Sequence, residues 1–79
     1  MRLDKFLKVS RLIKRRTVAN EACDAGRVLV NGVVAKASVK VKVGDIIEIR
    51  FGSSNTKIRV ESINENPRKE EAAAMYTML

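Results

Sequence analysis

The chain of 79 residues carries 16 lysine and arginine residues against 9 acidic ones, for a net charge of +7, and it contains no histidine. A chain of this length forms one domain with one small core, and without histidine it has no Ser-His-Asp or Cys-His machinery and no imidazole metal ligand. So large a positive surplus on so small a surface indicates a polyanionic partner, either nucleic acid or an anionic membrane.

The single cysteine, Cys23, excludes an internal disulfide and a zinc cluster, which suits a reducing compartment. No apolar run approaches the roughly 18–20 residues that span a bilayer, and the N-terminus lacks the apolar stretch of a signal peptide. We therefore expect a cytoplasmic protein that holds no metal and no cofactor.

Nearly all of the positive surplus lies in the first 16 residues, which hold seven basic side chains against Asp4 alone. A surface charged for solubility would mix both signs along the chain. The concentration therefore predicts a binding face for nucleic acid, with a solvated helix face followed by a basic turn as the alternative. The basic residues are Arg2, Lys5, Lys8, Arg11, Lys14, Arg15 and Arg16.

The first element in chain order is a short helix over residues 3–9. Leu3, Phe6 and Leu7 fall on one side of a helical wheel, and the cations fan across the other. Residues 11–16 follow as a basic connection, in which Leu12 and Ile13 can serve as anchors.

A second helix is expected to begin with Thr17 as its N-cap and to end at Gly26, which suits a left-handed terminal position. Four small residues form a narrow stripe that lets this helix approach its neighbour closely, and the last of them is expected to be a core residue rather than a reactive thiol. They are Val18, Ala19, Ala22 and Cys23.

After Gly26 the pattern changes to that of strands. Residues 28–30 and 33–35 flank Asn31-Gly32, the strongest two-residue signal for a β-hairpin. Residues 38–43 alternate strictly and are compatible with a further strand, although six residues leave this open. Ile47, Ile49 and Phe51 then share one face of a strand, residues 52–55 supply a loop, and Ile58 and Val60 continue a returning strand.

The last part of the chain, residues 64–69, is polar and contains the only proline, Pro67. Beyond it, the spacing of Ala72, Met75, Tyr76 and Leu79 predicts one face of a terminal helix. We expect this helix to pack on its own domain, with docking to a partner as the alternative. The predicted class is α+β. Residues 1–63 form one domain of two N-terminal helices followed by a small curved antiparallel sheet, and residues 64–79 form a linker and a short C-terminal helix.

Three motifs in this order resemble the RNA-binding domain named after small-subunit ribosomal protein S-four, the alpha-L motif. They occupy residues 2–7 (RLDKFL), 15–19 (RRTVA) and 26–32 (GRVLVNG), and they are supported by Lys36 and by residues 43–46 (VGDI). Each motif alone is weak, whereas their order and spacing together are specific. The resemblance covers residues 1–51.

Within that superfamily, residues 8–17 and 69–76 are similar to the RqcP family of bacterial ribosome-associated quality control, which is itself similar to the heat-shock protein fifteen family. The resemblance implies binding to rRNA and to peptidyl-tRNA on obstructed large ribosomal subunits. It further implies that the protein holds the P-site peptidyl-tRNA while RqcH brings alanyl-tRNA, so that a C-terminal alanine tail grows. The alternative is recycling of large subunits in the heat-shock manner, without tailing.

The resemblance also implies which residues contact RNA. Asp4 sits among the cations, and we expect it to orient a neighbouring arginine rather than to contact a base. Arg2 and Arg16 carry the most weight, because a guanidinium can bind two phosphate oxygens at once. The expected contacts are Arg2, Lys5, Arg11, Lys14, Arg15 and Arg16 most directly, and Arg27, Asn31 and Lys36 less directly.

Two other classes of function have little support in the sequence. Nothing in the pattern of carboxylates indicates two acids held together in a dry cleft, so we expect no enzyme and no small-molecule substrate. The basic first helix is short and has three apolar anchors, too few for stable insertion, so we expect no membrane partner. Because aromatic residues are scarce, we expect folded RNA to be recognised by shape and phosphate position.

Overall fold

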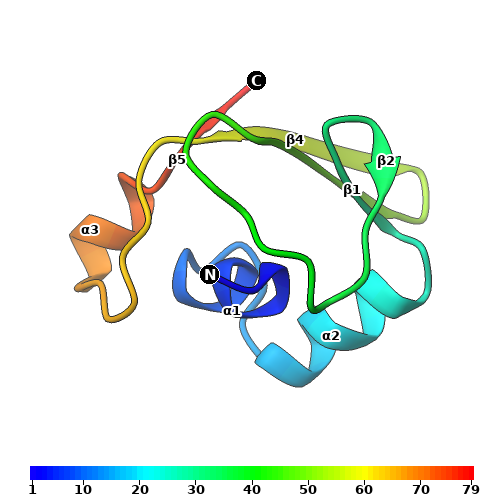
Figure 1. The fold of residues 1–79 in the computed structure, drawn as a ribbon, viewed down its shortest axis with the longest axis horizontal. Coiled ribbons are helices and arrows are strands. Elements are labelled where there is room, and N and C mark those ends of the chain that lie inside the picture. The colour runs from blue at the N-terminus through cyan, green and yellow to red at the C-terminus, as the bar shows by residue number, and fades with distance from the viewer.

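The computed structural model describes residues 1–79 as three helices and one five-stranded antiparallel sheet (Figure 1). The sheet order is β2-β1-β3-β4-β5. This arrangement confirms the predicted α+β class, with two helices ahead of the sheet and a short third helix near the C-terminus. The elements are α1 (Leu3–Val9), α2 (Arg16–Asp24), β1 (Val28–Val30), β2 (Val33–Val34), β3 (Ile46–Phe51), β4 (Ser54–Val60), α3 (Lys69–Ala73) and β5 (Tyr76–Met78).

The core lies between the sheet and the two N-terminal helices, which occupy the same side of it (Figure 1). The apolar stripe predicted for residues 3–9 is fully buried, and it meets alternate residues of β3 and β4. None of the three helices has the length and apolar character needed to cross a membrane. The fully buried residues include Leu3, Phe6, Leu7, Cys23, Val28, Ile47, Ile58 and Val60.

Helix α2 begins two residues earlier than expected. Its N-cap is Arg15, which makes no capping bond with its side chain, so the prediction of Thr17 as N-cap is wrong. The C-terminal prediction is confirmed, because Gly26 has a φ of +79° and the amide of Arg27 donates to the carbonyl of Ala22. Of the small-residue stripe, three members are buried, whereas Val18 remains 42% exposed.

The hairpin predicted at Asn31-Gly32 joins β1 to β2, with Val30 opposite Val33. Both turn residues have positive φ, +52° and +82°, which is the conformation that this dipeptide favours.

Residues 38–43 form no strand, which corrects the reading that their alternation left open. The segment instead crosses the N-terminal end of α1 and pairs with it: the Leu3 amide donates to the Val39 carbonyl, and the Val41 amide donates to the Met1 carbonyl. A single β-bridge joins Arg2 to Lys40. Of the three alternating valines only Val41 is buried, whereas Val39 and Val43 are exposed, so the alternation does not mark the buried face of a strand. The segment holds the first helix in position through its backbone hydrogen bonds.

The C-terminal part differs most from expectation. The β3–β4 turn is shorter than the predicted loop, since Ser54 already pairs with Phe51. The terminal helix ends at Ala73, and residues 76–78 form β5, which pairs with β4. Met75 is fully buried in the core, so the tail packs on its own domain.

Candidate nucleic-acid interface

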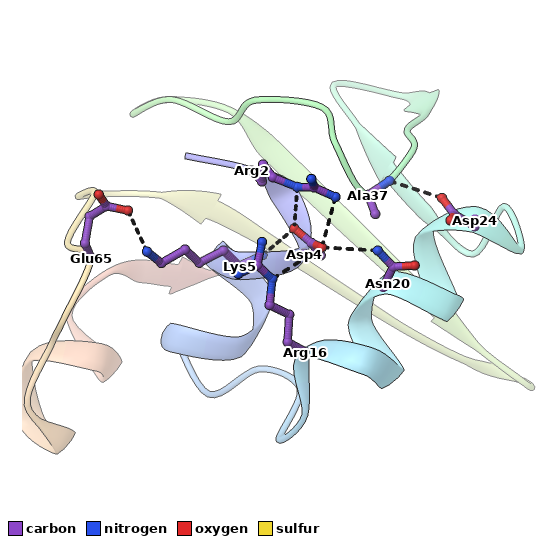
Figure 2. A network of polar contacts seen from close by, with 8 residues as sticks. All are labelled: Arg2, Asp4, Lys5, Arg16, Asn20, Asp24, Ala37 and Glu65. Atoms are coloured by element: carbon purple, nitrogen blue, oxygen red, sulfur yellow. Dashed lines mark hydrogen bonds and ion pairs between the residues drawn. The ribbon is translucent and has the colours of Figure 1, made fainter.

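The basic N-terminal region is organised around one buried carboxylate, that of Asp4, which is 2% exposed. Two arginines from different elements converge on it. Arg2 Nε lies 3.2 Å from Oδ1, and Arg16 Nε lies 3.4 Å from Oδ2 (Figure 2). The expectation that Asp4 orients a neighbouring arginine is confirmed, and it holds for two arginines rather than one.

Further donors complete the shell around this carboxylate. The Lys5 amide donates to Oδ1 at 2.8 Å, and the Asn20 side-chain amide donates to Oδ2 at 3.2 Å. Burial by itself would raise the pKa of Asp4, but the hydrogen bonds from Asn20, Arg16 and the Lys5 amide, together with the charge of Arg16, outweigh it and hold that pKa below its ordinary value. Asp4 therefore stays ionised at neutral pH and fixes both guanidinium groups.

The two guanidinium groups remain available to a ligand. The side chains of Arg2 and Arg16 are 47% and 48% exposed, although each has one side against Asp4. Two cations share one anion, so this cluster keeps a positive charge at the surface. Immobilised guanidinium groups lose less side-chain entropy when they bind phosphate, and their planar donor sets suit phosphate oxygens.

Lys5 reaches away from Asp4 toward the segment that precedes α3. Its ammonium lies 2.8 Å from Oε1 of Glu65 (Figure 2). The hydrogen bond and the charge of Lys5 hold the pKa of Glu65 below its usual range. Lys5, a predicted RNA contact, therefore already forms an ion pair within the chain, and its partner carboxylate is exposed.

The remaining basic residues of the N-terminal region lie at and beyond the C-terminal end of α1. A hollow of about 560 Å³ separates this end from the segment before α3. Arg15 stands outside the hollow as the N-cap of α2 and is exposed. The hollow is lined by Lys8, Val9, Arg11, Lys14, Glu65, Asn66 and Pro67.

Three residues assigned to RNA less directly are not part of the Asp4 cluster. Arg27 lines a smaller hollow beside Val18 and Phe51. The Asn31 side chain is engaged within the fold, since its Nδ2 donates to Asp45 Oδ1 at 3.1 Å and its Oδ1 accepts from the Ile46 amide at 2.9 Å. Lys36 is exposed and lies just before the segment that crosses α1. Contacts of these three residues with RNA stay predictions.

Two residues, one in the Asp4 cluster and one beside it, were not identified from the sequence. Asn20 holds Asp4 from across the helix pair, and its only sequence signal was its position on the second helix. Lys40 lies beside Arg2 through the β-bridge and extends the basic surface. The position of Lys40 opposite Arg2 could not be predicted, because the alternation of residues 38–43 was also compatible with a strand of the sheet.

The structure contains no cluster of three or more histidine, cysteine or acidic side chains that could hold a metal. Cys23 is fully buried, as expected of a core residue. Burial, followed by the charges of Asp4 and Asp24, raises the pKa of the Cys23 thiol to about 11. The N-terminal surface presents fixed guanidinium groups at Asp4 and ammonium groups around the hollow, and both kinds of group can bind anions.

Comparison with known proteins gives consistent matches. Residues 1–47 match the model of the S4 domain. The chain is 57% identical over 79 residues to the RQC P-site tRNA stabilizing factors of Listeria innocua and Bacillus subtilis; it is matched over its whole length and covers 86% and 92% of these relatives. Among solved structures, trimeric heat shock protein 15 of Vibrio cholerae matches with a TM-score of 0.91 at 35% identity, over all of this chain and 81% of that one.

Proposed function

Because the chain belongs to the S4 domain family, we propose that it is a non-catalytic RNA-binding protein of ribosome-associated quality control. In this proposal the protein binds the tRNA in the ribosomal P site and stabilises it there. The name of the similar relatives, RQC P-site tRNA stabilizing factor, describes this activity for those proteins. The match over the full length of this chain supports the proposal, since the helices that bear the basic residues lie within it.

The observation that carries the proposal is the pair of arginines fixed on Asp4. Arg2 and Arg16 are presented side by side from two elements, half exposed, by a carboxylate that is itself buried. Such a pair suits adjacent phosphate oxygens of a folded RNA, and it requires no aromatic stacking. Arg15, on the same turn, adds charge at the edge of this surface.

The more detailed proposal concerns partners. The protein would bind rRNA of a large ribosomal subunit that still carries peptidyl-tRNA, and it would act there in the cytoplasm. With RqcH as partner it would support the growth of a C-terminal alanine tail. Arg2, Lys5, Arg11, Lys14, Arg15 and Arg16 are the proposed principal contacts, with Arg27, Asn31 and Lys36 as secondary ones.

The second candidate is a heat-shock-type factor that recycles large subunits and stabilises peptidyl-tRNA without tailing. The structural likeness to heat shock protein 15 favours it. The higher identity to the quality-control factors favours the first proposal. A tailing reaction with RqcH, with and without the protein, separates the two: dependence of tail length on the protein supports quality control, and independence supports recycling.

The central test is co-sedimentation with large subunits that bear peptidyl-tRNA, in a sucrose gradient. Arg16→Ala should lose association while the protein stays folded, with only a modest loss of thermal stability, because Arg2, the Lys5 amide and Asn20 still hold the Asp4 carboxylate. Arg59→Ala is the matched control, because Arg59 on β4 is equally exposed and also pairs with one carboxylate, that of Glu61. Undiminished association of both Arg2→Ala and Arg16→Ala would overturn the assignment of this surface.

Salt dependence provides an independent readout of phosphate contacts. If the protein neutralises about five or six phosphates, the logarithm of the binding constant should fall with the logarithm of salt concentration at a slope of roughly −4 to −5. A slope near zero would contradict recognition through phosphates.

A further inference from the structure

A second set of cations lies apart from the Asp4 cluster and has no partners within the chain. The side chains of Lys8, Arg11 and Lys14 line the hollow beside the segment before α3, and none of them makes an ion pair. The other lining residues that carry polar side chains are Asn66 and Glu65, and Glu65 is neutralised by Lys5. Three unpaired cations facing one concavity create a local positive field.

Arg11 is held in a backbone conformation that its side chain does not favour. It follows Ser10, the C-cap of α1, and it has a φ of +65°, in the left-handed region where helices commonly end in glycine. Glycine would satisfy this turn with less strain. The side chain of Arg11 makes no hydrogen bond and no ion pair that would offset the strain, so the fold itself does not explain an arginine here.

The two sets of cations are separated along α1. Arg2 precedes the helix and Arg11 follows it, which places their backbones roughly 14 Å apart along the axis. Lys5 lies on α1 between them in the chain, and it pairs with Glu65 at the edge of the hollow, whose carboxylate side chain is 66% exposed (Figure 2 shows this pair). A neutral pair with an exposed acidic member therefore divides the basic surface into two positive regions.

We infer that the hollow lined by Lys8, Arg11, Lys14 and Asn66 is a second phosphate-binding site for an RNA backbone, separate from the Arg2–Arg16 site. This inference rests on the proposed RNA-binding function, and it assigns the phosphate contacts to two sites, the Arg2–Arg16 pair and the hollow. Arg11 supplies the planar donor set, Lys8 and Lys14 supply mobile charge, and the Asn66 amide supplies a neutral donor. Glu65 weakens the site, because it is the one acidic residue at its edge.

The test is a salt series of equilibrium binding to purified tRNA and, in parallel, to large subunits that carry peptidyl-tRNA. Arg11→Gly should lower affinity about tenfold and reduce the magnitude of the salt slope by about 1. Its melting temperature should equal or exceed that of the wild type, because glycine suits the left-handed turn. Arg11→Lys should keep most of the affinity, and Glu65→Gln should raise it.

Separateness of the two sites is tested by a double-mutant cycle of Arg11→Gly with Arg16→Ala. Independent sites give additive losses of binding free energy. Unchanged affinity of Arg11→Gly, or a double mutant no weaker than Arg16→Ala alone, would overturn the second site and leave the proposed function intact. Failure of the wild type to bind the subunits would instead refute the proposed function, while the tRNA series still decides whether the hollow binds RNA.

Discussion

Asp4 and Arg16 come from different helices, and Arg16 Nε lies 3.4 Å from Oδ2 of Asp4, which is almost completely buried. This ion pair does two things at once. It ties the start of α2 to the first turn of α1, and it aims a guanidinium group outward beside Arg2. A negatively charged residue thus becomes part of a surface whose proposed ligand is also negative.

Asp4→Asn should weaken RNA binding although it removes a negative charge. The amide cannot hold Arg2 and Arg16 as a carboxylate does, so both side chains become mobile before binding. Loss of charge-assisted hydrogen bonds should also lower the free energy of unfolding by about 1–3 kcal/mol. Equilibrium binding and urea denaturation measure the two effects.

Glu65→Gln is the control for this substitution, because it also removes a carboxylate that pairs with a cation, but at an exposed site. It should leave stability nearly unchanged and should not weaken binding. If Asp4→Asn bound RNA more tightly than the wild type, the affinity would depend on the net charge of the surface rather than on the orientation of Arg2 and Arg16 by Asp4.

Acidification should destabilise the protein through Asp4. The pKa of Asp4 in the folded protein is lower than its ordinary value, so the folded state favours the ionised carboxylate. The resulting stability is present above the ordinary carboxyl pKa of about 4 and is lost as pH falls through the lower folded value. Urea denaturation between about pH 5 and pH 2 should show a steeper loss for the wild type than for Asp4→Asn. Parallel curves would contradict the role of this carboxylate.

Much of the fold could be predicted because local chemistry decided it. The apolar stripe of Leu3, Phe6 and Leu7 fixed the first helix, and Gly26 and the Asn31-Gly32 turn fixed where the chain changes direction. These features depend on neighbours a few residues away. The orienting role of Asp4 was also accessible, since it stood alone among seven cations.

The errors arose where tertiary contacts overrode a local pattern. The alternation of residues 38–43 suited a strand, but their backbone pairs with the N-terminal segment instead. The spacing of Ala72, Met75 and Tyr76 suited a helix, but the exposed edge of β4 offered hydrogen bonds to residues 76–78. The hollow at Arg11 could not be foreseen, because its other wall is the distant segment of Asn66 and Pro67.

Asn31→Gly should affect stability more than RNA binding. Glycine tolerates the φ of +52° at this position, so the substitution removes only the side-chain bonds to Asp45 and to the Ile46 amide. The loss of these two bonds should cost about 1–2 kcal/mol of unfolding free energy. Thermal and urea denaturation measure this, with equilibrium RNA binding in parallel. A large loss of affinity at unchanged stability would support the predicted RNA contact instead.

Cys23 should resist thiol reagents while the protein is folded. With a pKa of about 11, only about 0.1% of the thiol is ionised near pH 8, and the side chain is also fully buried. Its reaction with a disulfide reagent should be slow in buffer and fast in denaturant. A native rate equal to the denatured rate would contradict the core placement of this thiol.

Met75→Ala should destabilise the whole domain, although Met75 lies only four residues from the C-terminal Leu79. Met75 is fully buried within the main core, and its carbonyl accepts hydrogen bonds from the amides of Glu61 and Ser62. Truncation of a buried methionine to alanine typically costs 2–5 kcal/mol, so a loss of about 2–4 kcal/mol is expected. Thr77→Ala, at an exposed position of β5, is the control and should cost much less, despite the loss of its hydroxyl bond to Glu61. Urea denaturation measures both effects. If both substitutions lower the free energy of unfolding equally little, the tail contributes little to the core. If Met75→Ala alone lowers it, in a single cooperative transition, α3 and β5 stabilise the fold that positions α1.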